Sequence, residues 1–385
     1  MIYLDSAATE KYGYVDNIVV DTITTAMKDS WQNPSSLYAT NVKERINKCR
    51  ANIAEFIGAK PDEIYFTSGA SESNSWAIRG FVDELLLDDY RKINIITTPI
   101  EHKSILEAVN HQASSVFVQY CDVDEFGLVD YEQLESLLYL CHENKEPVLV
   151  TIGIANNEIG TVQNARELAE LVHKYDGVFH IDATQAVGHI PIYVEELGVD
   201  MLSASGHKIS PVLRGVGFLY KKNCINIQPL IHGAQEGGMR GGTENTYAIL
   251  GLNKAIEHCI LSYEVMSELC ERRDYFIGLL QSEFGCKLNG HSKYRLLNNI
   301  NVTFPQNIMG ESLLYMLDIC DIKVSVGSAC NAKSIEPSHV LKAIGLTDEE
   351  AMRSVRFSLP KDITYEEIDY VIKEIGNCIK LMEIN

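Results

Sequence analysis

The chain has 385 residues, 46% of them hydrophobic and 22% charged, which is enough to bury a large core and a second smaller one. Its formal net charge of −20 argues against a nucleic-acid surface, because neutralising phosphates requires clustered Lys and Arg. No apolar run approaches the roughly 18 residues that span a membrane, and residues 1–5 lack the features of a secretion signal. We therefore expect a cytoplasmic protein that binds neither nucleic acid nor membranes directly.

Between about residues 64 and 220, short apolar runs alternate with amphipathic stretches. This alternation predicts an α/β fold with a mostly parallel sheet covered by helices. The apolar runs are 64–66, 94–96, 148–150 and 178–181.

The pattern changes after Gly242. A long amphipathic stretch covers residues 247–284, an apolar run covers 299–304, and a closing helix is expected over about 365–381. We read these as a smaller α+β domain. The expected division is a large cofactor-binding domain of residues 12–258 and a small domain of residues 1–11 and 259–385.

The ten cysteines include no Cys-x-x-Cys pair. Cys259, Cys270 and Cys378 fall within helical patterns, so most cysteines should be reduced and should pack as small apolar residues. We assign no metal site. The residues considered for one and set aside are His111, His142, His173 and Cys320.

Lys208 follows an apolar run at residues 199–202 and the short segment 203–207. This order places a lysine at the carboxyl end of a strand, where open α/β sheets bind ligands. Such a lysine forms a Schiff base with an aldehyde cofactor if burial or a neighbouring cation lowers its pKa, because only the neutral amine attacks. A lysine by itself does not establish this chemistry, so the interpretation depends on its surroundings.

Two other segments could hold such a cofactor. Asp182 ends the run 178–181, and its carboxylate could bind the protonated pyridine nitrogen of pyridoxal phosphate, although an aspartate here is also a common helix cap. The small residues of segment 67–74 join a strand to a helix, where backbone N–H groups converge on a phosphate; an ordinary capping box is the alternative. The order of turn, aspartate and lysine resembles the class V aminotransferase group of fold-type I pyridoxal-phosphate enzymes, whose large domain has a seven-stranded type of sheet.

Cys330 lies in a small and polar segment before a predicted helix. Its thiolate could act as a nucleophile if a nearby cation lowered its pKa, but the spacing leaves a structural role equally open. Segments 327–330 (Gly-Ser-Ala-Cys) and 337–341 (Pro-Ser-His-Val-Leu) resemble the active-cysteine loop of cysteine desulfurases, in the long-loop form of iron-sulfur assembly and nitrogen fixation. Further ordered matches are Tyr3-Leu4-Asp5, Asn33-Pro34-Ser35-Ser36, Glu101-His102-Lys103, Asn156-Asn157-Glu158-Ile159-Gly160, Gly242-Thr243-Glu244-Asn245 and Arg356-Phe357-Ser358.

The resemblance implies a cysteine desulfurase, a sulfurtransferase that uses pyridoxal 5'-phosphate to convert L-cysteine to L-alanine. Lys208 would carry the cofactor, and Cys330 would receive the sulfur as a persulfide for an acceptor protein such as an iron-sulfur scaffold. His102 would stack on the pyridine ring and could also act as acid or base near neutrality. These are the three residues expected to be catalytic.

The resemblance also implies the binding residues. Arg356 would grip the substrate carboxylate with two parallel hydrogen bonds, helped by Asn157 and Asn33. Thr243 would reach the phosphate of the neighbouring subunit, so a complete site requires a homodimer. The implied cofactor contacts are Ala70, Ser71, His102, Asn157, Asp182, Gln185, Ser205, His207, Lys208 and Thr243.

The family pattern is not matched everywhere. Segment 209–215 differs from the usual Gly-Pro-Lys-Gly turn and is about one residue longer, whereas segment 232–240 is about one residue shorter. Ser71 stands where threonine is frequent, Ser6 where asparagine is frequent and Pro360 where glycine is common. None of these changes removes a reacting group.

Two other functions fit parts of the pattern. A selenocysteine lyase or another class V enzyme would share Lys208, Asp182 and His102 but need not depend on Cys330. A non-catalytic scaffold would lack the cofactor and its yellow absorbance. The catalytic motifs do not encode which protein accepts the sulfur.

Overall fold

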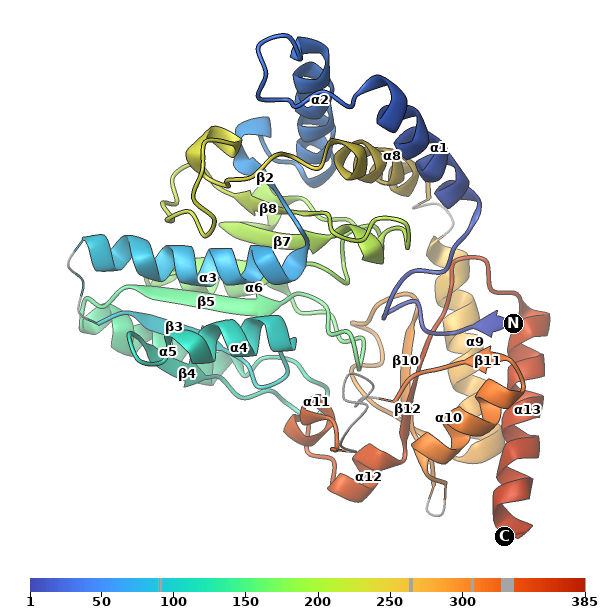
Figure 1. Cartoon of the computed structure of the whole chain (residues 1–385). Coiled ribbons are helices and arrows are strands. Elements are labelled where there is room, and N and C mark those ends of the chain that lie inside the picture. Colours follow the sequence, from blue (N-terminus) through green and yellow to red (C-terminus); the bar gives the residue numbers. More distant parts are fainter. Residues whose placement is uncertain (89, 91, 263–265, 306–307, 327–335, 385) are drawn as a thin grey trace.

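The computed structural model describes residues 1–384 except 89, 91, 263–265, 306–307 and 327–335. Its largest sheet has seven strands in the order β2-β8-β7-β6-β5-β3-β4 (Figure 1). The strands from β7 to β4 are parallel, and β8 runs antiparallel to both β7 and β2. This arrangement confirms the predicted α/β fold. The strands are β2 Ile64–Thr67, β3 Asn94–Thr97, β4 Phe117–Tyr120, β5 Val148–Gly153, β6 Val178–Asp182, β7 Met201–Ser205 and β8 Gly217–Lys221.

Helices cover both faces of this sheet. At the start of α5 the Asp130 side chain accepts the Gln133 N–H, and at the start of α6 the Asn164 side chain accepts the Glu167 N–H. Among the described residues, no helix is long and apolar enough to cross a membrane. The helices are α1 Tyr14–Asp29, α2 Thr40–Ile57, α3 Ala70–Leu87, α4 Lys103–Gln112, α5 Tyr131–Glu143, α6 Ala165–Lys174, α7 Val194–Leu197 and α8 Thr246–Ser262.

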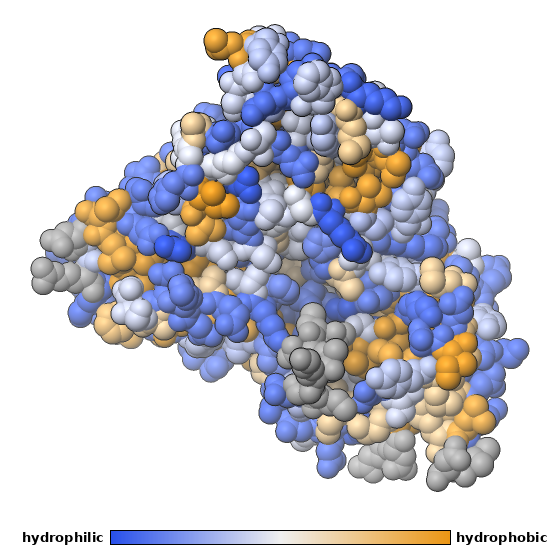
Figure 2. All heavy atoms as spheres, viewed as in Figure 1, coloured by the Kyte–Doolittle hydropathy of each residue, from blue (hydrophilic) through white to orange (hydrophobic). Residues whose placement is uncertain are grey.

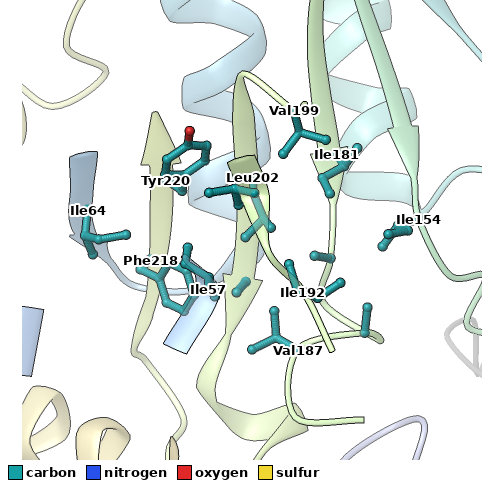
Figure 3. Packing of buried hydrophobic residues seen from close by; sticks show 14 of the residues in the cluster. Ile57, Ile64, Ile154, Ile181, Val187, Ile192, Val199, Leu202, Phe218 and Tyr220 are labelled. Atoms are coloured by element: carbon teal, nitrogen blue, oxygen red, sulfur yellow. The ribbon is translucent and has the colours of Figure 1, made fainter. Parts of the chain in front are cut away.

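Alternate side chains of the central strands enter different cores because successive residues of a strand point to opposite faces. Phe218 and Tyr220 pack with Leu202 in the core that also contains Ile57 of α2 (Figure 3). Leu219, between them, packs on the other face with residues of α3 and α4. A sheet buried on both faces is held rigidly, so the loops at its edge are placed precisely in space.

The rest of the chain builds a second core. The antiparallel sheet β12-β10-β9 and the short parallel pair β1-β11 pack with long helices, and β1 brings Leu4 into this core (Figure 1). The stretch 247–284, predicted as one amphipathic unit, forms two helices, α8 and α9. The elements are β1 Ile2–Tyr3, α9 Met266–Phe284, β9 Lys287–Leu288, β10 Asn299–Thr303, α10 Gly310–Ile319, β11 Ile322–Lys323, α11 His339–Ala343, α12 Asp348–Met352, β12 Ser354–Ser358 and α13 Tyr365–Ile384.

The two cores support the division into a large domain of residues 12–258 and a small domain of residues 1–11 and 259–385, which we retain as a proposal. Cys259 and Leu296 pack with the first core, so the chain does not change cores at a single residue. Figure 2 shows the surface hollowed between the two parts, with mainly hydrophilic and intermediate side chains around the hollow.

Candidate active site

Lys208 lies at the edge of the large sheet, at the end of a short 3-10 turn, Gly206–Lys208, that directly follows β7. Its Nζ donates hydrogen bonds to the carbonyl oxygens of Ala7 (2.6 Å) and Ala8 (2.8 Å). Gln185, which follows β6, donates from Nε2 to the same Ala7 oxygen at 2.9 Å. The N-terminal segment therefore brings Lys208 and Gln185 together, although the sequence pattern singled out neither Ala7 nor Ala8.

Asp182 is buried at the end of β6, beside the strand that leads to Lys208. Its Oδ2 accepts a hydrogen bond from Asn74 Nδ2 at 2.7 Å, and its Oδ1 accepts the Thr184 N–H at 2.9 Å. Asn74 also donates to Ser104 Oγ at 2.9 Å, which links Asp182 to the His102 turn. Asn74 belongs to the segment 67–74 that was expected to form the phosphate turn, and it lies about one helical turn after Ala70, the first residue of α3.

His102 caps the start of α4 with its own side chain. Its Nδ1 accepts the Ser104 N–H at 3.1 Å, so the neutral ring carries its proton on Nε2. Burial lowers the pKa of His102, nearby Asp182 opposes this shift, and Lys208 adds to it. In this conformation the neutral ring has no free lone pair, which favours a stacking or proton-donating role over that of a base.

A cradle for a phosphate lies where β2 leads into α3. Gly69 has φ of +148°, and a Cβ there would come within 3.3 Å of Ser205 Oγ. The N-terminus of α3, with Ala70 and Ser71, presents backbone N–H groups beside this turn. Ser205 Oγ is in turn within 2.9 Å of His207 Nδ1. Burial, followed by the charge of Lys208, lowers the pKa of His207 to about 4, so this ring is neutral at pH 7.

Arg356 on β12 marks the opposite side of the site. Its Nη2 donates to Asp5 Oδ1 at 2.6 Å and its Nη1 donates to the Asn157 carbonyl oxygen at 3.0 Å. The buried Nε has no hydrogen-bond partner among the described residues. Arg356 also pairs through its backbone with Ser325, just before the segment that contains Cys330. A guanidinium that is held in one orientation and still has N–H groups available is suited to bind a carboxylate.

Two buried glutamates connect the turns around this site. Glu101 accepts hydrogen bonds from the Thr98 hydroxyl (2.6 Å) and the Gly153 N–H (2.7 Å), and burial raises its pKa to about 7. Glu158 accepts a hydrogen bond from Ser338 Oγ at 2.5 Å, and burial raises its pKa as well. Both lie in segments that match the family pattern, although neither was among the predicted site residues.

Two predicted site residues have no hydrogen bond to this cluster within the described part of the chain, and a third falls outside that part. Asn33 lies in the exposed loop between α1 and α2, and its Oδ1 accepts the Ser35 N–H at 2.9 Å. Thr243 is exposed and lines a cavity of about 200 Å³ with Ser68 of the phosphate turn. Cys330 lies outside the described residues.

The described residues fit pyridoxal phosphate. Gly69 and the α3 N-terminus leave room and donors for a phosphate, and Asp182 offers a buried carboxylate to a protonated ring nitrogen. The side chains of Asn74, Thr184 and Arg356 each keep one buried polar atom without a partner among the described residues. Such atoms are costly in an apolar interior, which makes them natural contacts for a polar ligand.

Comparisons with known proteins agree with this geometry. The class-V aminotransferase profile matches residues 2–371. A cysteine desulfurase IscS from Dictyoglomus turgidum is 42% identical over 98% of this chain and 94% of its own length, and an IscS from Methanosarcina thermophila is 39% identical over 98% and 92%.

Solved structures show the same relationship. A NifS-like protein superposes with a TM-score of 0.88 at 33% identity, covering 99% of both chains. SspA in complex with cysteine superposes with a TM-score of 0.79 at 35% identity, covering 94% of this chain and 99% of its own. The enzymes of this family depend on pyridoxal phosphate, which confirms the predicted cofactor. The chain therefore belongs to the class-V aminotransferase family and, within it, to the cysteine desulfurases.

Proposed function

We propose that the protein removes sulfur from L-cysteine, releases L-alanine and holds the sulfur as a persulfide on Cys330. The observation that carries this proposal is the convergence of Lys208, Asp182 and His102 at one sheet edge, with the Arg356 guanidinium on β12 across from them. A lysine, a buried carboxylate and an imidazole are what a pyridoxal-phosphate site needs, and Arg356 suits an amino-acid carboxylate.

When bound, pyridoxal phosphate supplies an electron sink that makes the α-proton of an amino acid removable. Ser205, His207 and the N-terminus of α3 would hold its phosphate, and Asp182 and Gln185 its ring nitrogen and phenolic oxygen. Lys208 would carry the cofactor covalently. Asn74 holds the Asp182 carboxylate in place by a 2.7 Å hydrogen bond, so Asp182 needs little reorganisation when the ring arrives.

Arg356 orients the substrate. Because Asp5 and the Asn157 carbonyl oxygen fix two of its nitrogens, the guanidinium plane is set before cysteine binds. The substrate's carboxylate then fixes where its α-carbon and thiol lie relative to Lys208. The Lys208 amine donates hydrogen bonds to the Ala7 and Ala8 carbonyl oxygens, which fix its position, while the His102 Nε2–H can donate a proton.

Cys330 takes the sulfur. Its thiolate attacks the substrate sulfur, the carbon–sulfur bond breaks with its electron pair going to the substrate fragment, and a persulfide remains on the protein. A persulfide is a reversible state of cysteine, so it can be passed to a second thiol. We propose an acceptor protein such as an iron-sulfur scaffold for that step.

The site is completed in a homodimer. Thr243 and Asn33 are both exposed, which is expected for residues that act on the neighbouring subunit. The loop that carries Asn33 also exposes Leu37 and Tyr38, at 98% and 77% of their surface, and such apolar exposure is usual where a second chain packs. Cytoplasmic localisation remains part of this proposal.

The test measures sulfide and alanine released from L-cysteine with dithiothreitol as reductant. Wild-type protein should release both in equal amounts, while Cys330→Ala should keep the yellow colour of bound cofactor and lose activity. Cys286→Ala serves as the matched control, because Cys286 is buried in the second core. Full activity of Cys330→Ala would point to a lyase mechanism instead, and a colourless wild-type protein would point to a scaffold.

A further inference from the structure

The turn that carries Lys208 departs from the usual family sequence, and the structure shows what holds it. The Gly206 N–H donates to the Val216 carbonyl oxygen at 2.9 Å, and the Ile209 and Ser210 N–H groups both return to the Gly206 carbonyl oxygen. These bonds shape the turn itself. Two buried polar side chains beneath it tie it to neighbouring segments of the chain.

The first tie is His189, which lies after β6 and is only 5% exposed. Its Nε2 is 3.2 Å from the Lys208 carbonyl oxygen and must donate, because a carbonyl oxygen only accepts. Burial lowers the pKa of His189 to about 3, so the ring supplies this hydrogen bond without a positive charge. A charged ring here would repel the lysine ammonium, whereas a neutral ring acts through geometry.

The second tie is Asp16, at the start of α1. Its Oδ2 accepts the Gly13 N–H at 2.6 Å, and its Oδ1 accepts a hydrogen bond from the Ser210 hydroxyl. Asp16 is 4% exposed and Ser210 is fully buried. Ser210 belongs to the segment in which this chain departs from the usual turn, and its hydroxyl ties that altered sequence to α1.

The groups that surround His189 are charged but shielded from solvent. The Glu10 carboxylate is 3.8 Å from His189 Nε2 and is 8% exposed, and the Glu10 N–H donates to the His207 carbonyl oxygen at 3.3 Å. Burial raises the pKa of Glu10 to about 7, with Lys361 opposing this shift and Asp16 adding to it, whereas burial, Lys361 and Lys208 all lower the pKa of His189. Residues 206, 207, 208 and 210 are thus each held by a hydrogen bond, so this backbone has little freedom to move.

We propose that His189 and the Ser210–Asp16 pair are positioning residues that hold the backbone of the Lys208 turn. By holding this backbone, they keep the Lys208 amine where it can react with the cofactor. The inference rests on the proposed role of Lys208. Reacting atoms must meet within a narrow range, and a displacement of about 1 Å can cost up to roughly 100-fold in rate. None of the three side chains contacts the amine itself in the described hydrogen bonds.

The test compares His189→Gln with His189→Leu in the purified holoenzyme. Gln keeps an N–H donor near the position of Nε2, whereas Leu fills the space without one. We expect His189→Leu to lower kcat roughly 10- to 100-fold with little change in KM, and His189→Gln to recover most of that loss. His111→Leu, at an exposed histidine of α4, should behave as wild type.

Spectroscopy separates positioning from an electrostatic role. Because His189 is neutral, His189→Gln should leave the pH midpoint of the cofactor's yellow absorbance where it is in wild type. A moved midpoint in His189→Gln, or equal kcat values for the Gln and Leu variants, would overturn the inference. If His189→Leu fails to fold, Ser210→Ala carries the test, since it releases the other tie, and a wild-type kcat in that variant would overturn the inference too.

Failure of the underlying function would look different. Lys208→Ala should lose both the yellow absorbance and alanine formation. If Lys208→Ala kept both, the role assigned to the lysine would be wrong whatever the His189 variants showed.

Discussion

Replacing Arg356 by lysine tests how the substrate carboxylate is held. In the wild-type protein, Arg356 Nη2 lies 2.6 Å from Asp5 Oδ1. A lysine would keep a positive charge next to Asp5, but it cannot form two parallel hydrogen bonds with a carboxylate. The planar fork and its unpartnered Nε would be lost. A charge-assisted hydrogen bond contributes about 1.5 to 3 kcal/mol, so losing one should lower kcat/KM roughly 10- to 150-fold.

The assay is the initial rate of alanine formation across a range of L-cysteine concentrations. Arg353→Lys is the matched control, since Arg353 lies just before the same strand and, among the described residues, its side chain donates only to the Phe304 and Glu349 carbonyl oxygens. Melting temperatures of both variants show whether the Asp5 contact survives. A kcat/KM within about threefold of wild type in Arg356→Lys would refute the carboxylate role, because the loss of one charge-assisted bond exceeds that factor.

Three further predictions follow from the same geometry. Asp182→Asn removes the charge and keeps one amide oxygen that can accept from Asn74 or from the Thr184 N–H, so the holoenzyme should stay folded and lose at least about tenfold in kcat; a wild-type kcat would contradict the pyridine role. Gly69→Ala strains a residue with φ of +148° and crowds Ser205, so pyridoxal phosphate should bind the apoenzyme roughly 5-fold more weakly by absorbance titration, while Gly278→Ala, in open space, should bind normally. Burial raises the pKa of Glu10 from 4.5 to about 7, so its contribution to stability is present below pH 4.5 and is lost as pH rises through 7. Relative to Glu10→Gln, wild type should therefore lose up to roughly 3 kcal/mol in urea unfolding between pH 4.5 and pH 8, and parallel curves for the two proteins would disprove this.

The sequence alone was enough for the fold class and for the placement of Lys208 and Asp182 at the ends of neighbouring strands. Short apolar runs alternating with amphipathic stretches predict a parallel sheet with helices on both faces, because strand and helix periods differ. Lys208 and Asp182 each follow such a run, and the carboxyl ends of parallel strands share one edge. Their proximity was therefore predictable from local order.

The sequence could not predict contacts between distant segments. Ala7 meets Lys208, Asp5 meets Arg356 and Asp16 meets Ser210, each pair separated by nearly 200 residues or more, and backbone carbonyls carry no sequence signal. The tautomer of His102 was equally hidden, because it depends on the Ser104 N–H at the start of α4.

Local propensity and periodicity act over a few residues, so the sequence by itself determined the elements and the chemical groups at their ends. The charge state and orientation of those groups depend on burial and on partners brought in by the whole fold, as for neutral His189 beneath Lys208. Only the tertiary structure decided these, because desolvation and hydrogen-bond geometry exist only once distant segments have packed together.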